Sequence, residues 1–173
     1  MASDAPFQLG AQMVLEDCRE ALRLLEEQPS GTTWRVQWSA CCTLLRTVRN
    51  VLFEVDIKDD THPRELVKEV QSFRDGMKAS EPEPKIYWGF IAESANIILH
   101  EYDLHAGQGI TIHVGANIEA GEAPHTRSYP IHDGPFEGQD QRDVVREAID
   151  WWEKQLEEII IKAAARSIAT LLD

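Results

Sequence analysis

Residues 139–172 read QDQRDVVREAIDWWEKQLEEIIIKAAARSIATLL, a stretch without glycine or proline. Its apolar side chains recur at helical spacing, at Val145, Ala148, Ile149, Trp152, Leu156, Ile159, Ile160 and Ala163. A helix of this length would span roughly 50 Å at about 1.5 Å per residue, which is longer than one small core requires. Trp151 and Ile161 widen the apolar surface beyond one face, so we expect either a partner chain or the first helix or the flap to cover part of this helix.

Four more segments toward the N-terminus show helical periodicity. We predict helices over residues 8–27, about 32–55, about 62–78 and about 86–104. Residues 79–85 contain two prolines among acidic residues, and they are predicted to be a connection rather than helix. The second of these helices carries three arginines, which is a high concentration for so acidic a chain.

The period changes from helical to alternating after residue 108. Ile110, Ile112 and Val114 alternate with polar residues, which predicts a strand, and residues 127–131 could pair with it. The sequence therefore predicts a mostly α protein, a single domain over residues 1–173. We expect a four- or five-helix bundle with a β hairpin or flap inserted at about 108–136, before the long C-terminal helix.

Composition restricts the classes of partner. The chain has 17 Lys and Arg against 30 Asp and Glu, a net charge of −13 and a pI near 4.8. A field of this sign repels nucleic acid and anionic membranes, so RNA contact would need a local basic patch or an assembled cleft. Three cysteines without a CxxC pair, no export signal and no long apolar run lead us to expect reduced thiols in a cytoplasmic protein that does not contact membranes.

The fourth predicted helix contains FIAESANIILHEYDLHAG at residues 90–107. Helical spacing predicts an apolar face and a polar face on it. The apolar face comprises Tyr87, Phe90, Ile91, Ile98, Leu99 and Tyr102, and the polar face comprises Glu93, Asn96, His100 and Asp103.

This segment resembles the signature helix of HEPN-domain proteins, which are helical bundles whose active members are metal-independent ribonucleases working as dimers. Asn96 and His100 match the polar residue and the histidine of the family pattern, whereas Ala95 stands where the family carries arginine. The resemblance implies that arginine and histidine from both chains of a dimer would stabilise charge and transfer protons as an RNA 2′-hydroxyl attacks the phosphate. The match covers roughly a tenth of the chain.

Ala95 can supply neither charge nor protons, so it implies either a natural non-catalytic member or an inactivating substitution. If catalysis survives, His100 would transfer the proton, and Asn96 would orient either His100 or the phosphate. Arg46 or Arg49 would then supply the missing positive charge. We expect a homodimer with an RNA or protein partner. The alternative is an interaction module without catalytic ancestry, which binds a protein through the long helix and the flap.

We expect neither a cofactor nor a metal site. Histidines and acids crowd residues 100–105, but His105 falls past the expected helix end. The only Glu-x-x-His sequence, Glu122 to His125, contains Pro124 and lies in the predicted flap rather than on a helix. Cys41 and Cys42 lie in an amphipathic helix, where a core-facing thiol would be inert.

Overall fold

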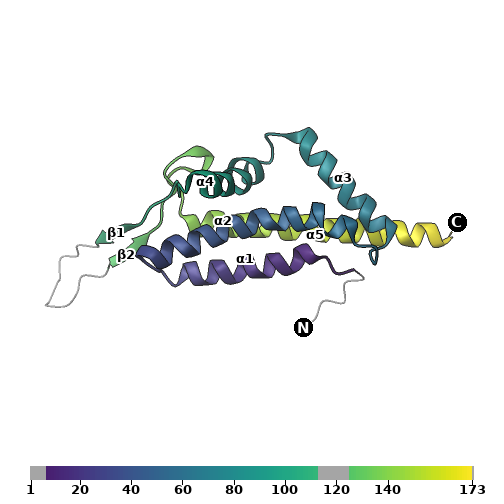
Figure 1. Ribbon diagram of the computed structural model, residues 1–173, viewed down its shortest axis with the longest axis horizontal. Coiled ribbons are helices and arrows are strands. Elements are labelled where there is room, and N and C mark those ends of the chain that lie inside the picture. The colour runs from purple at the N-terminus through teal and green to yellow at the C-terminus, as the bar shows by residue number, and fades with distance from the viewer. Residues whose placement is uncertain (1–6, 113–124, 173) are drawn as a thin grey trace.

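The computed structural model describes residues 7–112 and 125–172, and it confirms a mostly helical bundle (Figure 1). Three helices run side by side along the long axis: α1 (Gly10–Glu26), α2 (Gly31–Glu54) and α5 (Gln141–Leu172). A short 3₁₀ turn, η1 (Asp56–Lys58), leads to α3 (Arg64–Ser80), which packs obliquely on α5. The π-helix η2 (Ile86–Ala92) and α4 (Glu93–Glu101) then lie over α2.

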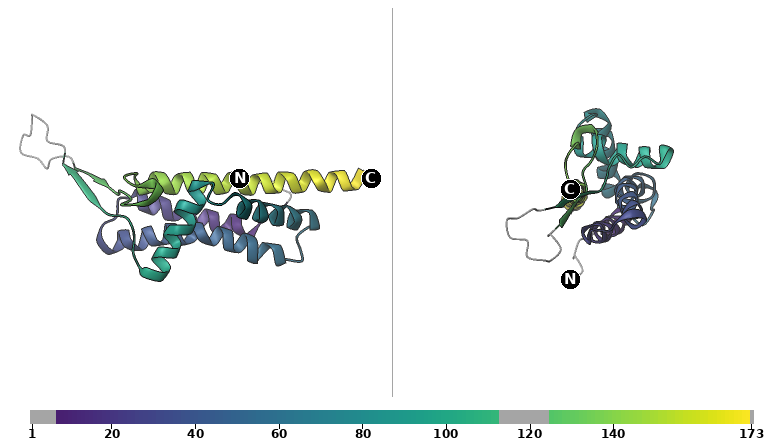
Figure 2. Two further views of the ribbon diagram at one scale, coloured as in Figure 1. Left: turned by 90° about the horizontal axis from the view of Figure 1, so that it is seen from above. Right: turned by 90° about the vertical axis from the view of Figure 1, so that its left-hand side faces the viewer.

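The strands project from the end of the bundle opposite the C-terminus (Figure 2). Strands β1 (Gly109–Ile112) and β2 (His125–Ser128) form an antiparallel pair, in which Ile110 faces Arg127. A single turn, η3 (Gly134–Phe136), follows before α5. The expected hairpin is confirmed in these residues, whereas Val114 lies outside the described part of the chain.

The core is centred on α5, and every residue predicted for its apolar stripe is buried. Indole N–H groups connect the layers around it. Trp152 donates to the carbonyl of Leu45 on α2 at 3.1 Å, and Trp34 donates to the fully buried amide oxygen of Gln141 at 3.0 Å. Trp38 donates to the carbonyl of Leu104 at 2.9 Å. These bonds satisfy indole groups that would otherwise cost free energy on burial.

One buried acid fixes the start of α1. The Asp56 carboxylate accepts hydrogen bonds from the amides of Gly10 (2.8 Å) and Ala11 (3.1 Å). Those amides belong to the first helical turn and have no partner within the helix, and the helix dipole favours an anion there. A Cβ atom on Gly10 would lie 2.9 Å from the Asp56 Oδ1 atom, so glycine permits this close approach.

Trp151 is covered by the chain itself. Its ring lies 5.6 Å from that of Tyr87 and 6.5 Å from that of Phe73 on α3, measured between centroids. The expectation that α1 would cover part of α5 is confirmed, since the two helices pack together, whereas the side that carries Trp151 is covered by α3 and η2. Ile161, in contrast, is 67% exposed.

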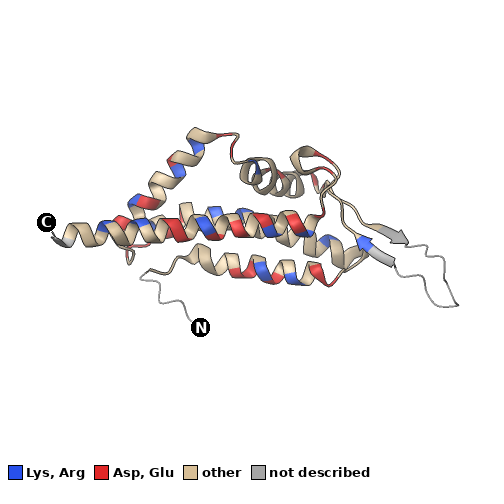
Figure 3. Ribbon diagram, turned by 180° about the vertical axis from the view of Figure 1, so that it is seen from behind, with Lys and Arg blue, Asp and Glu red and all other residues tan. Residues whose placement is uncertain are grey.

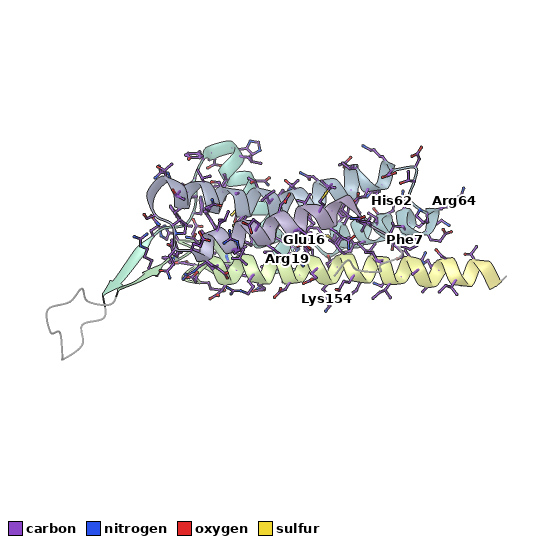
Figure 4. All side chains as sticks on the ribbon, turned by 90° about the horizontal axis from the view of Figure 1, so that it is seen from below. Phe7, Glu16, Arg19, His62, Arg64 and Lys154 are labelled. Atoms are coloured by element: carbon purple, nitrogen blue, oxygen red, sulfur yellow. The ribbon has the colours of Figure 1, made fainter. Side chains whose placement is uncertain are left out.

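Ion pairs bind α1 to α5 along the outer surface, where acidic and basic residues alternate (Figure 3). Arg19 contacts Glu16 on its own helix and Glu153 on α5, both at 2.6 Å, and it lies beside α5 in Figure 4. Arg146 on α5 reaches Glu26 at 2.5 Å. No helix in residues 7–112 or 125–172 is both long and apolar enough to cross a membrane.

Candidate functional site

The fourth predicted helix begins as a π-helix, and this changes which side chains face outward. A π-helix closes its hydrogen bonds one residue later than an α-helix, so the apolar stripe shifts around the axis. Ala95 and Ile98 consequently face the interior, whereas Leu99 is 66% exposed and Tyr102 is 69% exposed. The prediction that Leu99 belongs to the buried face is wrong for this reason, and the prediction for Tyr102 is wrong because the helix ends before it.

The helix also ends earlier than predicted. Glu101 is the last helical residue, and Tyr102 adopts the left-handed conformation with φ 53°. The predicted polar side chains Glu93, Asn96 and His100 are all exposed. Together with Leu99 and Tyr102 they form a surface that we name the α4 outer face.

Ala95 lies on the opposite side of α4 and is completely buried. Since α4 packs on α2, the methyl group of Ala95 belongs to the contact between the inner side of α4 and the bundle. A guanidinium group at this position would have to displace packed side chains or leave the interior.

The two arginines considered as replacement charges occupy different environments. Arg46 on α2 is half-buried and donates from Nη1 to the carbonyl of Ala92 at 3.3 Å, next to α4. Arg49 instead lies over the ring of Phe53, 5.2 Å from its centroid, and donates to the side chain of Asn50 at 3.1 Å. Arg46 contacts the η2 segment near its junction with α4, whereas Arg49 interacts with Tyr87 earlier in that segment.

Arg46 and Asn96 line the same surface hollow of about 490 Å³. Its other walls come from Trp88 and Ala92 of the η2 segment and from Pro135 of η3. A volume of this size falls within the range of small-molecule sites, roughly 300–1,000 Å³. His100 does not line this hollow. Asn96 therefore shares the hollow with Arg46, and it neighbours His100 one turn further along α4.

The hollow was not predicted, because four separate segments of the chain build it. Residues 81–85 supply one rim, and the close approach of η3 supplies another. Gly89 permits that approach, since a Cβ atom on it would lie 2.8 Å from the Cγ atom of Pro135. The spacing of five between the buried residues Ile86 and Ile91, typical of a π-turn, was the one available signal in the sequence.

A histidine that pairs with an aspartate lies just after the C-terminal end of α4. His105 Nδ1 lies 2.7 Å from Asp133 Oδ1, and its Nε2 lies 3.5 Å from Asp103 Oδ2. The hydrogen bond to Asp133 raises the pKa of His105 above its ordinary value of 6.5, with further contributions from Asp133, Asp103 and Glu101. Below that raised pKa, the protonated imidazole connects the end of α4 to the residues before η3.

All three cysteines are free and buried. Burial raises the pKa of the Cys18 and Cys41 thiols to about 12 and raises the pKa of Cys42 well above its ordinary range. The thiolate is the reactive form, so these groups are inert at neutral pH. In the part of the chain that the structure describes, no three His, Cys, Asp or Glu side chains gather as a metal-binding group would require.

Comparison with family models, curated proteins and solved structures finds no match to this chain.

Proposed function

We propose that the chain is a non-catalytic cytoplasmic protein of HEPN type that acts as a homodimer, with the α4 outer face of one copy packed on the same face of another. The observation that carries the proposal is the exposure of Leu99 (66%) and Tyr102 (69%) directly beside Asn96 and His100. Large apolar side chains that gather on an exposed surface are typical of protein interfaces.

The polar residues of this face are self-complementary. Glu93, Asn96 and His100 are spaced three and four residues apart, and so they share one line along the helix. In a two-fold antiparallel pairing, Asn96 of one copy would lie near Asn96 of the other, because it is close to the midpoint between Glu93 and His100. Each copy would then place its Glu93 opposite the His100 of the other, as a two-fold interface requires.

Charge supports a non-catalytic role over RNA cleavage. Glu93, Glu101 and Asp103 are exposed around His100, and the chain as a whole has a net charge of −13. The cation that the family pattern places beside its polar residue is replaced by the buried methyl group of Ala95. Arg46 donates to a backbone carbonyl from a half-buried position, on the hollow side of Asn96 rather than beside His100.

Light scattering after size exclusion at micromolar concentrations tests the proposal, with a matched pair of variants. Leu99→Asp places a charge at the centre of the proposed interface, whereas Ile161→Asp changes a side chain of nearly equal exposure on α5. Wild type and Ile161→Asp should elute as dimers, and Leu99→Asp should be a monomer. A monomeric wild type, or a dimeric Leu99→Asp variant, would contradict the proposal.

Labelled RNA tests the non-catalytic part separately. The wild-type dimer should leave single-stranded RNA intact after prolonged incubation. Cleavage by the wild type that is lost in a His100→Ala variant would replace the non-catalytic proposal with an active ribonuclease, and it would do so without affecting the dimer result.

A second candidate function is a protein interaction module that uses the end of α5. Ile161 and Ile168 are 67% and 60% exposed and lie seven residues apart, on one side of the helix. Ala163 is the last buried residue in the part of α5 up to residue 170, and the helix extends past the core there (Figure 1). A dimer that Ile161→Asp dissociates and Leu99→Asp leaves intact would favour this second function.

A further inference from the structure

The hollow beside Asn96 contains an arginine without an acidic partner. Arg46 is half-buried, and its only hydrogen bond within residues 7–112 and 125–172 goes from Nη1 to the Ala92 carbonyl at 3.3 Å. None of the carboxylates in these residues forms an ion pair with it, although acidic residues outnumber basic ones by 30 to 17 in the chain. A partly desolvated guanidinium with free N–H groups is well suited to bind a carboxylate through two parallel hydrogen bonds.

The walls around Arg46 supply an apolar surface. Trp88 lines the hollow from the η2 segment. Pro82, Ala92 and Pro135 complete the apolar lining. The π-helix that carries Trp88 is itself a rare element, found frequently at functional sites.

The rim has the opposite charge from the floor. Glu81, Glu83 and Glu93 line the hollow and are exposed, with Lys85 as the one basic residue beside them. Three carboxylates at the entrance oppose the entry of a multiply charged anion such as a phosphate. They favour a ligand that carries a positive group some distance from its carboxylate.

We propose that this hollow binds a small zwitterion with an apolar body, of the class of an apolar α-amino acid or a short peptide. Its carboxylate is held by Arg46, its ammonium group lies toward the glutamates of the rim, and its apolar part packs on Trp88 and the prolines. Arg46, Trp88 and the prolines all belong to one copy of the chain, so the site does not require the proposed dimer, although it shares Glu93 and Asn96 with the α4 outer face.

Isothermal titration calorimetry with three probes tests the charge requirement. Phenylalanine should bind, and both phenethylamine, which lacks the carboxylate, and 3-phenylpropionate, which lacks the ammonium group, should bind at least about tenfold more weakly. A dipeptide of two phenylalanines covers the peptide case. The absence of binding for phenylalanine and for the dipeptide would overturn the proposal, and so would equal binding of inorganic phosphate.

Variants assign the two charged contacts. Arg46→Gln should weaken phenylalanine binding at least about tenfold, whereas Arg35→Gln should leave it unchanged. Arg35 is a half-buried arginine of the same helix that bonds Thr32 and does not line the hollow. Binding by Arg46→Gln at the wild-type level would overturn the assignment, once a thermal melt has shown that the variant is folded.

The exposed rim residue Glu81 provides an independent check that does not disturb folding. Glu81→Gln should weaken phenylalanine binding but should not weaken 3-phenylpropionate binding, because only the first probe carries an ammonium group. Equal effects on both probes would contradict the proposed orientation. Repeating the titration with the monomeric Leu99→Asp variant should give the wild-type affinity, and this separates failure of the ligand site from failure of the dimer.

Discussion

The α4 outer face and the end of α5 expose apolar side chains to the same extent and differ in their polar neighbours. Leu99 is 66% exposed and Ile161 is 67% exposed. Beside Leu99, Glu93 and His100 have no ion-pair partner among the described residues, whereas beside Ile161 the side chains of Lys162 and Glu158 pair with each other at 3.2 Å. Exposure alone therefore does not distinguish the two surfaces. The charges left without partners make the α4 outer face the stronger candidate for binding a second copy.

The largest expected effect on stability comes from placing a positive charge on the buried side of α4. Ala95→Arg should lower the free energy of unfolding by about 3 kcal/mol or more, because an unpaired guanidinium would enter the contact between α4 and the bundle. Ala165→Arg, on the exposed part of α5, should change it by less than about 0.5 kcal/mol. Urea denaturation followed by circular dichroism measures both.

A stable Ala95→Arg protein would show that α4 can turn its inner side outward. The variant would then also become a direct test of whether an arginine at position 95, as in the HEPN pattern that this segment resembles, produces RNA cleavage that depends on His100. If Ala95→Arg is unstable, a lack of RNA cleavage by this variant gives no information about catalysis.

The charge pairing across the proposed interface predicts an intermediate effect. His100→Glu should weaken the dimer at least about tenfold, because each copy would then place like charges opposite each other. Adding Glu93→Lys to His100→Glu exchanges the charges and should restore much of the affinity, as a double-mutant cycle measures. Sedimentation equilibrium gives the dissociation constants.

Lys154→Glu provides the control for that cycle, since Lys154 is an exposed residue of α5. It should leave the dimer unchanged. If the double variant is no tighter than His100→Glu alone, then the antiparallel register is wrong, even if Leu99→Asp dissociates the dimer.

The sequence predicted α5 well and the surface of α4 poorly, for a physical reason. Along α5 the period is that of a regular α-helix, so the spacing of apolar residues such as Trp152 and Leu156 identifies the buried face directly. In the α4 segment the π-helix shifts that spacing, so counting in regular turns places Leu99 on the wrong side, and Tyr102 lies beyond the helix end that the pattern predicted. The hollow around Arg46 could not be predicted, because its walls meet only after the 81–85 connection and η3 have packed beside η2.

The smallest expected effect on stability comes from the pair of His105 and Asp133, which follows the C-terminal end of α4. The pKa of His105 is raised in the folded chain, chiefly by its hydrogen bond to Asp133. A raised pKa means that the folded chain retains the proton more tightly than the unfolded chain. The stabilisation is therefore fully present below the unfolded value of about 6.5, and it is lost as the pH rises through the folded value.

Asp133→Asn should lower the free energy of unfolding by a few tenths of a kcal/mol at pH 5.5 and by less at pH 9, because the pair is solvent-screened. Urea titrations at the two pH values measure the difference, and Asp150→Asn, an exposed aspartate on α5, serves as the control. Dimer affinity should follow the same trend, since His105 holds the segment that directly follows Tyr102. An Asp133→Asn variant that loses more stability at pH 9 than at pH 5.5 would show that the pair stabilises the fold with a neutral imidazole, as a hydrogen bond rather than as an ion pair.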